Sequence, residues 1–135
     1  MPRPLWLAIR DKGLCNFVAM SYPILHIRKG KDQSLMRRHP WVFSGAIESD
    51  TESLKDGDLV CLCTRKDQFL GIGHFQHATI SVRILSFEFE EINQEFFNRK
   101  IKQAVDSRLG IGLLSETNSI FRICHGEGDE LPGLV

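Results

Sequence analysis

The sequence has 135 residues, of which 42% are hydrophobic and 25% charged, and its formal net charge at pH 7 is zero. This balance is typical of a soluble globular chain and excludes a disordered or low-complexity protein. The length suffices for one core, or for one small domain with part of a second, and no apolar run approaches the roughly 20 residues that cross a bilayer. We therefore expect no membrane partner.

The neutral total hides an uneven distribution of charge along the chain. Residues 1–45 contain 8 Lys and Arg against 2 Asp and Glu, whereas residues 46–135 contain 9 against 15. Attraction of nucleic acid to the chain as a whole is therefore not expected, but a locally basic face remains open.

Residues 1–21 show no sustained hydrophobic period, and Arg3, Arg10 and Lys12 interrupt the apolar run that a signal peptide needs. Met20 stands directly before the first well-patterned stretch. We expect residues 1–21 to be an N-terminal extension or arm, and Met20 to be the native start.

From residue 22 onward, the pattern is that of short strands separated by turns. A short helix capped by Asp32 or Ser34 is expected between the first two strands; it must end near His39 because Pro40 disfavours helix before it. Close spacing without a long intervening helix favours a small antiparallel β-barrel over residues 22–92. The expected strands cover residues 24–27, 41–43, 59–64, 69–75 and 79–87.

The hydrophobic period then changes to that of a helix over residues 93–110, with Asn93 as the expected N-cap and Gly110 as the glycine that follows the last turn. A further strand is expected at residues 120–124, with no partner later in the chain. We expect residues 111–135 to be the truncated start of a second domain. The expected fold class is mainly β with a linking helix, a β-rich α+β chain.

The densest functional signal is a basic strip between the first two expected strands, followed at once by Trp41 and Phe43. Cations position a protein on phosphates, and aromatic rings and Arg planes stack on unpaired bases. The strip is a candidate RNA-binding site, although a solvated charged loop beside core aromatic residues has the same pattern. Its members are Arg28, Lys29, Lys31, Arg37, Arg38 and His39.

The remaining motifs predict no catalytic, cofactor or metal site. The Gly71-x-Gly73 pair lacks the third glycine and the helix of a dinucleotide-binding loop, and it indicates a bulge or a close backbone approach. His125, Glu127 and Asp129 alternate as metal ligands or an acid–base pair could, yet the glycines between them favour a tight turn.

The four cysteines lack the C-x-x-C spacing of a zinc ribbon or a thioredoxin-like redox pair. We expect them to be reduced, buried thiols in a cytoplasmic protein. They are Cys15, Cys61, Cys63 and Cys124.

Several short stretches between Tyr22 and Val135 together form a more specific pattern than any one of them. They are residues 37–47 (RRHPWVFSGAI), 57–60 (GDLV), 69–73 (FLGIG), 81–85 (SVRIL), 125–129 (HGEGD) and 131–135 (LPGLV). In this order they resemble the N-terminal part of SAM-dependent methyltransferases of the ribosomal RNA large subunit methyltransferase I type. Glu130 departs from the glycine that this family usually has there.

The resemblance implies a domain order. A PUA domain, a small β-barrel that binds RNA, is implied at residues 22–92, a connecting helix at 93–110, and the start of a central α+β domain at 111–135. It implies ribosomal RNA as the partner, and S-adenosylmethionine as the cofactor with which the full-length protein methylates carbon five of a cytosine.

The resemblance also implies that the catalytic parts are absent from these 135 residues. The SAM-binding loop and the nucleophilic cysteine of the family would lie beyond Val135, so this chain is expected to hold no cofactor and no catalytic residue. The alternative is a PUA-like scaffold that serves homodimerisation or domain docking without contacting RNA.

Overall fold

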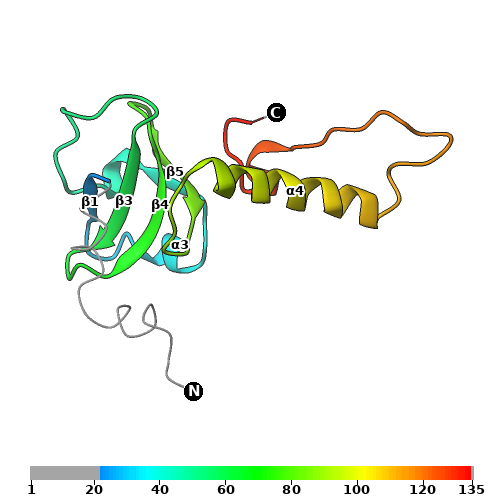
Figure 1. The fold of residues 1–135 in the computed structure, drawn as a ribbon. Coiled ribbons are helices and arrows are strands. Elements are labelled where there is room, and N and C mark those ends of the chain that lie inside the picture. The colour runs from blue at the N-terminus through cyan, green and yellow to red at the C-terminus, as the bar shows by residue number, and fades with distance from the viewer. Residues whose placement is uncertain (1–21, 135) are drawn as a thin grey trace, which may run out of the picture. The chain divides into compact units, whose positions relative to one another are not determined.

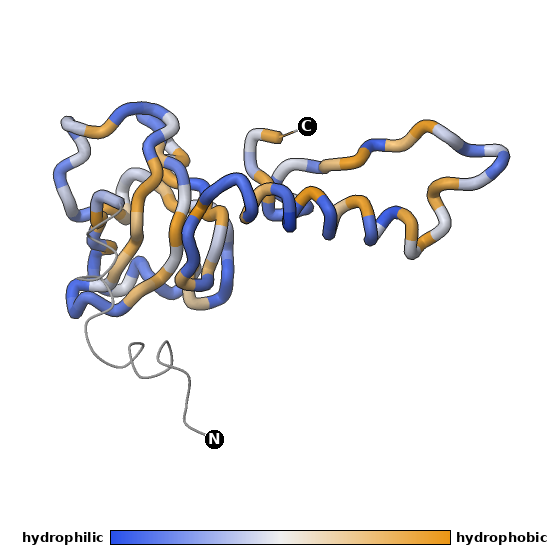
Figure 2. Tube along the Cα trace, in the orientation of Figure 1, coloured by the Kyte–Doolittle hydropathy of each residue, from blue (hydrophilic) through white to orange (hydrophobic). Residues whose placement is uncertain are grey.

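The computed structural model describes residues 22–134, which fall into two compact units that divide after Phe89 (Figure 1). Among these described residues, the first unit contains all the strands, and the second contains one long helix. The extension expected at residues 1–21 lies outside the described residues. No helix among the described residues is long and apolar enough to cross a membrane. Figure 2 accordingly shows hydrophobic and hydrophilic positions alternating along that helix.

The first unit is one curled sheet of five strands, in the order β1-β3-β4-β5-β2. Its mainly β character, followed by one long helix, confirms the expected fold class. All pairs are antiparallel except β1 with β3, which are parallel, so the expectation of a wholly antiparallel barrel is wrong. The strands are β1 Ile24–Ile27, β2 Trp41–Phe43, β3 Leu59–Thr64, β4 Phe69–Phe75 and β5 Ile80–Ser86.

The parallel pair follows from the path of the chain between β1 and β3. After β1 the chain passes through helix α3 (Gln33–Met36) to β2 at the far edge of the sheet, and then through the 3-10 helix η1 (Ser44–Ala46). It returns beside β1, where Ile27 and Ile47 form an isolated antiparallel bridge. A long crossover of this kind lets β3 run in the same direction as β1.

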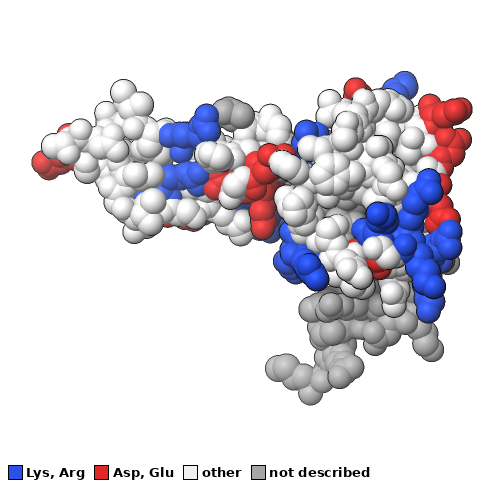
Figure 3. Space-filling view, turned by 180° about the vertical axis from the view of Figure 1, so that it is seen from behind, with Lys and Arg blue, Asp and Glu red and all other residues white. Residues whose placement is uncertain are grey.

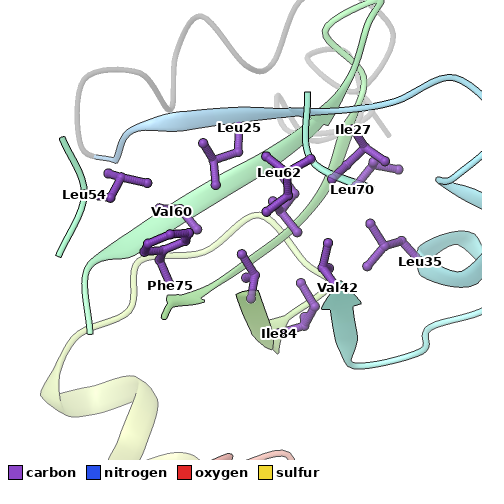
Figure 4. Packing of buried hydrophobic residues seen from close by; sticks show 12 residues of the cluster. Leu25, Ile27, Leu35, Val42, Leu54, Val60, Leu62, Leu70, Phe75 and Ile84 are labelled. Carbon is purple, nitrogen blue, oxygen red and sulfur yellow. The ribbon is translucent and has the colours of Figure 1, made fainter. Parts of the chain in front are cut away.

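The core fills the concave side of the sheet, because alternate residues of each strand point inward. Val60 and Leu62 on β3 pack against Leu25, Phe75 and their neighbours (Figure 4). The full cluster comprises Leu25, Ile27, Leu35, Val42, Ile47, Leu54, Val60, Leu62, Leu70, Phe75, Val82 and Ile84.

The other face of β3 carries Cys61 and Cys63, which pack with Tyr22, Ile24 and Phe69. Both cysteines are fully buried, and Cys124 in the second unit is also buried. Cys61 and Cys124 are free thiols, as expected, whereas Cys63 is disulfide-bonded, so the expectation of a reduced thiol is wrong for Cys63. Burial raises the pKa of the Cys61 thiol to about 12. A thiol with so high a pKa is not a nucleophile at neutral pH.

The second unit is built on helix α4, Gln94–Gly110. The side chain of Asn93 caps it as expected, by accepting a hydrogen bond of 3.0 Å from the Phe96 amide. Gly110 is the last helical residue rather than the one after it, and Gly112 takes the positive φ of +73°.

The segment after α4 differs from its prediction. Residues 120–124 form no strand, because no ladder partner exists for them within residues 22–134. The chain instead reaches a 3-10 helix, η2 (Gly126–Asp129), and Leu131 and Cys124 pack against Ala104 of α4. The glycine-rich turn expected at residues 125–129 is therefore present as η2.

Candidate nucleic-acid interface

The register of the ladders brings several connections to one end of the sheet. β1 and β3 end together, with Ile27 opposite Thr64, and β4 begins there, with Phe69 opposite Cys63. β5 ends and β2 starts on this side as well, because both pairs are antiparallel. Residues 28–40, 65–68 and 87–89 therefore share one end of the first unit, which we call the basic end.

Charge is segregated between the two ends of this unit. The basic end has seven Lys and Arg (Arg28, Lys29, Lys31, Arg37, Arg38, Arg65, Lys66) against three acids (Asp32, Asp67, Glu88), and Glu48 reaches it from the following loop through its ion pair with Arg65. The loop that leads to the opposite end has one cation, Lys55, against Asp50, Glu52, Asp56 and Asp58. Figure 3 shows this separation on the strand-containing unit, with blue atoms mainly in its lower part and red atoms mainly above.

All six residues of the basic strip are exposed at this end, but only some of their side chains form hydrogen bonds or ion pairs. Within the described part of the chain, the side chains of Lys29, Lys31 and Arg37 have no hydrogen bond or ion pair. Lys29 and Lys31 belong to the turn that the Lys31 amide closes on the Arg28 carbonyl, at 3.0 Å. These three side chains are free to contact an anion.

Arg28 and Arg38 are held by neighbouring groups. Arg28 Nε donates to the Ile47 carbonyl at 3.1 Å. Arg38, whose φ is +60°, donates through Nη2 to Glu88 Oε1 at 2.6 Å, and its guanidinium lies 5.6 Å from the centre of the Phe87 ring. These two arginines shape the basic end more than they add free charge to it.

His39 serves the fold locally. Its Nδ1 accepts a hydrogen bond of 3.2 Å from the Trp41 amide, and its ring meets the Trp41 ring edge-on, with centroids 5.8 Å apart. The half-buried Trp41 is thereby joined to the end of the basic strip.

The sequence analysis missed two cations at this end. Arg65 and Lys66 belong to the β3–β4 turn, 26 or more positions from the strip, and only the parallel pairing of β1 with β3 makes them its neighbours. Arg65 forms a two-pronged ion pair with Glu48 that lowers the pKa of that carboxyl. Lys66 has no side-chain partner among the described residues.

The aromatic residues are also redistributed. Trp41 lies near the basic end, but Phe43 pairs with Ile80 at the start of β5 and so lies toward the opposite end. The rings that do gather at the basic end are Phe87, under Arg38, and Phe69 with Phe89.

In the second unit, the Asp129 carboxylate of the expected turn is engaged by an arginine of α4. No cluster of metal-ligating side chains occurs among the described residues. Both oxygens of Asp129 accept from Arg108, at 2.7 and 2.6 Å, and Oδ2 also accepts from the His125 amide at 2.6 Å. The Arg108 guanidinium holds the pKa of Asp129 below its usual value. The Asp129 carboxylate therefore links η2 to α4 through Arg108.

The next residue, Glu130, stands in the left-handed region with a φ of +57°, which explains why a glycine suits this position in the family that the sequence resembles. Glu130 forms an ion pair with Lys100, a nearly buried side chain on α4. The ion pair gives this chain a second link between α4 and η2.

The curled sheet has a counterpart among known domain families. Residues 25–87 match the family described as a PUA-like domain, which spans β1 to just beyond β5. Residues 25–87 therefore belong to the PUA-like domains.

Proteins named ribosomal RNA large subunit methyltransferase I are similar to this chain over both units. The protein from Aeromonas hydrophila is 37% identical over 113 residues, which cover 82% of this chain and 28% of the relative. The protein from Pseudoalteromonas atlantica is 38% identical, with 81% and 28% covered. The chain thus spans less than a third of the length of these relatives.

Solved structures show the same fold. The structure described as "A putative sam-dependent methyltransferase from Streptococcus mutans" superposes with a TM-score of 0.66 at 19% identity, over 82% of this chain and 29% of that one. A methyltransferase structure complexed with SAH gives a TM-score of 0.67, also at 19% identity, over 82% of this chain and 28% of that one.

Proposed function

We propose that this chain is the RNA-targeting part of a SAM-dependent 23S ribosomal RNA (cytosine-5) methyltransferase, and that the basic end of its PUA-like domain binds structured ribosomal RNA. The names of the relatives support the class of enzyme. S-adenosylmethionine and the catalytic residues belong, in this proposal, to a part of the protein outside these 135 residues.

The observation that carries the proposal is the gathering of unpaired cations at one end of the domain. Lys29, Lys31, Arg37 and Lys66 come from two separate loops, and their side chains have no partner in the described chain. Four exposed cations that repel one another are stabilised by a polyanion, and phosphate contacts of this kind position a protein on RNA.

Salt-dependent binding tests the proposal. If each of the four cations contacts one phosphate of single-stranded RNA, the logarithm of affinity should fall with the logarithm of salt concentration with a slope near −3, at roughly −0.7 per contact. Mobility-shift titrations of the 135-residue chain with a large-subunit RNA fragment give this slope. Single alanine substitutions of these residues should each reduce it by about 0.7.

Lys55→Ala is the matched control, since Lys55 is an exposed lysine on the loop that leads to the end of the sheet opposite the basic end. It should leave affinity and slope unchanged. Arg37→Lys should keep the slope but weaken binding to a structured loop, because lysine lacks the planar fork of arginine. Salt-insensitive binding no tighter than that of a neutral control protein would favour the scaffold instead.

A further inference from the structure

The first unit has two exposed aromatic side chains among its described residues, at opposite ends of the sheet. Phe43 is 48% exposed and lies toward the end opposite the basic end, whereas Phe89 is 42% exposed and lies at the basic end. We infer that Phe89 is a stacking platform for an unpaired base of the bound RNA. This inference rests on the proposed RNA binding and adds a base-contacting residue to it.

The position of Phe89 follows from the β4–β5 ladder. Ser86 stands opposite Ile72, so three residues further along, Phe89 comes level with Phe69 at the start of β4. The two rings meet edge to face, with centroids 5.8 Å apart and planes at 89°. Phe69 is itself anchored in the cluster around Cys61 and Cys63, so it holds the Phe89 ring in a defined orientation.

The other aromatic rings at this end are already engaged. The Arg38 guanidinium covers Phe87, and the half-buried Trp41 is in contact with His39. Phe89 is therefore the exposed phenylalanine at the basic end, where Phe69 and Phe87 are half-buried. It is an exposed apolar ring at the same end of the domain as the unpaired cations.

Cations and Phe89 would act on different parts of one ligand. Lys29, Lys31, Arg37 and Lys66 would contact the backbone, whereas the ring would take a base that is not paired. Stacking of this kind contributes about 1–3 kcal/mol per base in alanine substitutions, which corresponds to roughly 5- to 140-fold in affinity. Because a ring carries no charge, its contribution is independent of the salt slope.

The test compares Phe89→Leu with Phe43→Leu in the 135-residue chain, with two RNA probes. One probe is a hairpin with an unpaired loop, and the other is a duplex of the same length without one. Leucine keeps the apolar bulk but removes the π-face. Phe89→Leu should weaken binding of the hairpin by roughly 5- to 140-fold and leave duplex binding and both salt slopes unchanged. Phe89→Tyr should restore hairpin binding, and Phe43→Leu should change nothing.

The outcomes separate this inference from the proposal on which it rests. Unchanged hairpin affinity in Phe89→Leu, while alanine at Lys29 or Arg37 still reduces the salt slope, refutes stacking and leaves RNA binding at the basic end intact. Equal losses in Phe89→Leu and Phe43→Leu also refute it. A parent chain without salt-sensitive RNA binding refutes both. Thermal melting of each variant verifies that the domain remains folded.

Discussion

Adding one methyl group at Gly73 should disrupt the sheet that carries the basic end. A Cβ atom built at Gly73 would lie 2.3 Å from the carbonyl oxygen of Arg83 and 2.8 Å from a methyl group of Val82. Ordinary contacts of this kind are 3.4–4 Å. The obstacle is backbone of the neighbouring strand, so it cannot be relieved by a rotamer change.

The magnitude follows from what must move. Restoring an ordinary contact requires β4 and β5 to separate by about 1 Å where Gly73 pairs with Ile84 and His74 with Arg83. Overpacking costs about 1–3 kcal/mol, and weakening two ladder hydrogen bonds adds about 0.5–1.5 kcal/mol each. We therefore expect Gly73→Ala to lower the free energy of unfolding by roughly 2–6 kcal/mol, a large share of the total for a small domain.

Two other glycines provide a graded control. At Gly71 a Cβ would lie 3.2 Å from the Ser86 carbonyl oxygen, a contact that a small shift relieves, so the loss should be about 1 kcal/mol. At Gly45 a Cβ meets nothing within 4 Å, and alanine should change stability by less than about 0.5 kcal/mol.

Urea denaturation followed by circular dichroism measures all three variants, and hydrogen exchange of the β4 and β5 amides locates the damage. The expected order of destabilisation is Gly73, then Gly71, then Gly45. A Gly73→Ala protein as stable as the parent, or a Gly45→Ala protein destabilised as much as Gly73→Ala, would show that close approach of β4 and β5 does not govern this position.

Three further predictions concern individual side chains. Asp129→Ala should destabilise the second unit more than Asp106→Ala, because the Asp106 carboxylate forms only an exposed ion pair. Since the pKa of Asp129 is lowered from 3.8, the difference between the two variants in free energy of unfolding, measured by urea denaturation, should be largest above pH 3.8 and should shrink as the pH falls below it. Cys61, with its pKa raised to about 12, should resist alkylation at neutral pH until the chain unfolds, as peptide mass spectrometry would show. Asn93→Ala should cost the helix about 1 kcal/mol in thermal denaturation, and an unchanged midpoint would contradict its role as N-cap.

Local patterns in the sequence determined most of the elements. The bounds of β3 and β4 agree with their predictions, because turn residues flank apolar runs at both ends. Asn93 was identifiable as an N-cap because its side chain acts on an amide only three residues away. The close backbone approach at Gly73 was also predictable, because a glycine inside a strand often marks a place where a neighbouring backbone leaves no room for a side chain.

Predictions that depended on distant partners were less successful. The strand expected at residues 120–124 is absent, since β-structure forms only where a second strand pairs with the first. The expectation of an antiparallel barrel was wrong for the pairing of β1 with β3, which is parallel, because local residue patterns carry no information on strand direction.

The basic strip itself was visible in the sequence as a cluster of charges, because its members are close neighbours along the chain. What only the tertiary structure decided is which cations are free and which groups share their end of the domain. Arg38 is engaged by Glu88, Lys66 joins from the β3–β4 turn, and Phe89 rather than Phe43 is the exposed phenylalanine at that end. The physical reason is that strand register brings together side chains far apart in sequence, and register is set by the packing of the whole sheet.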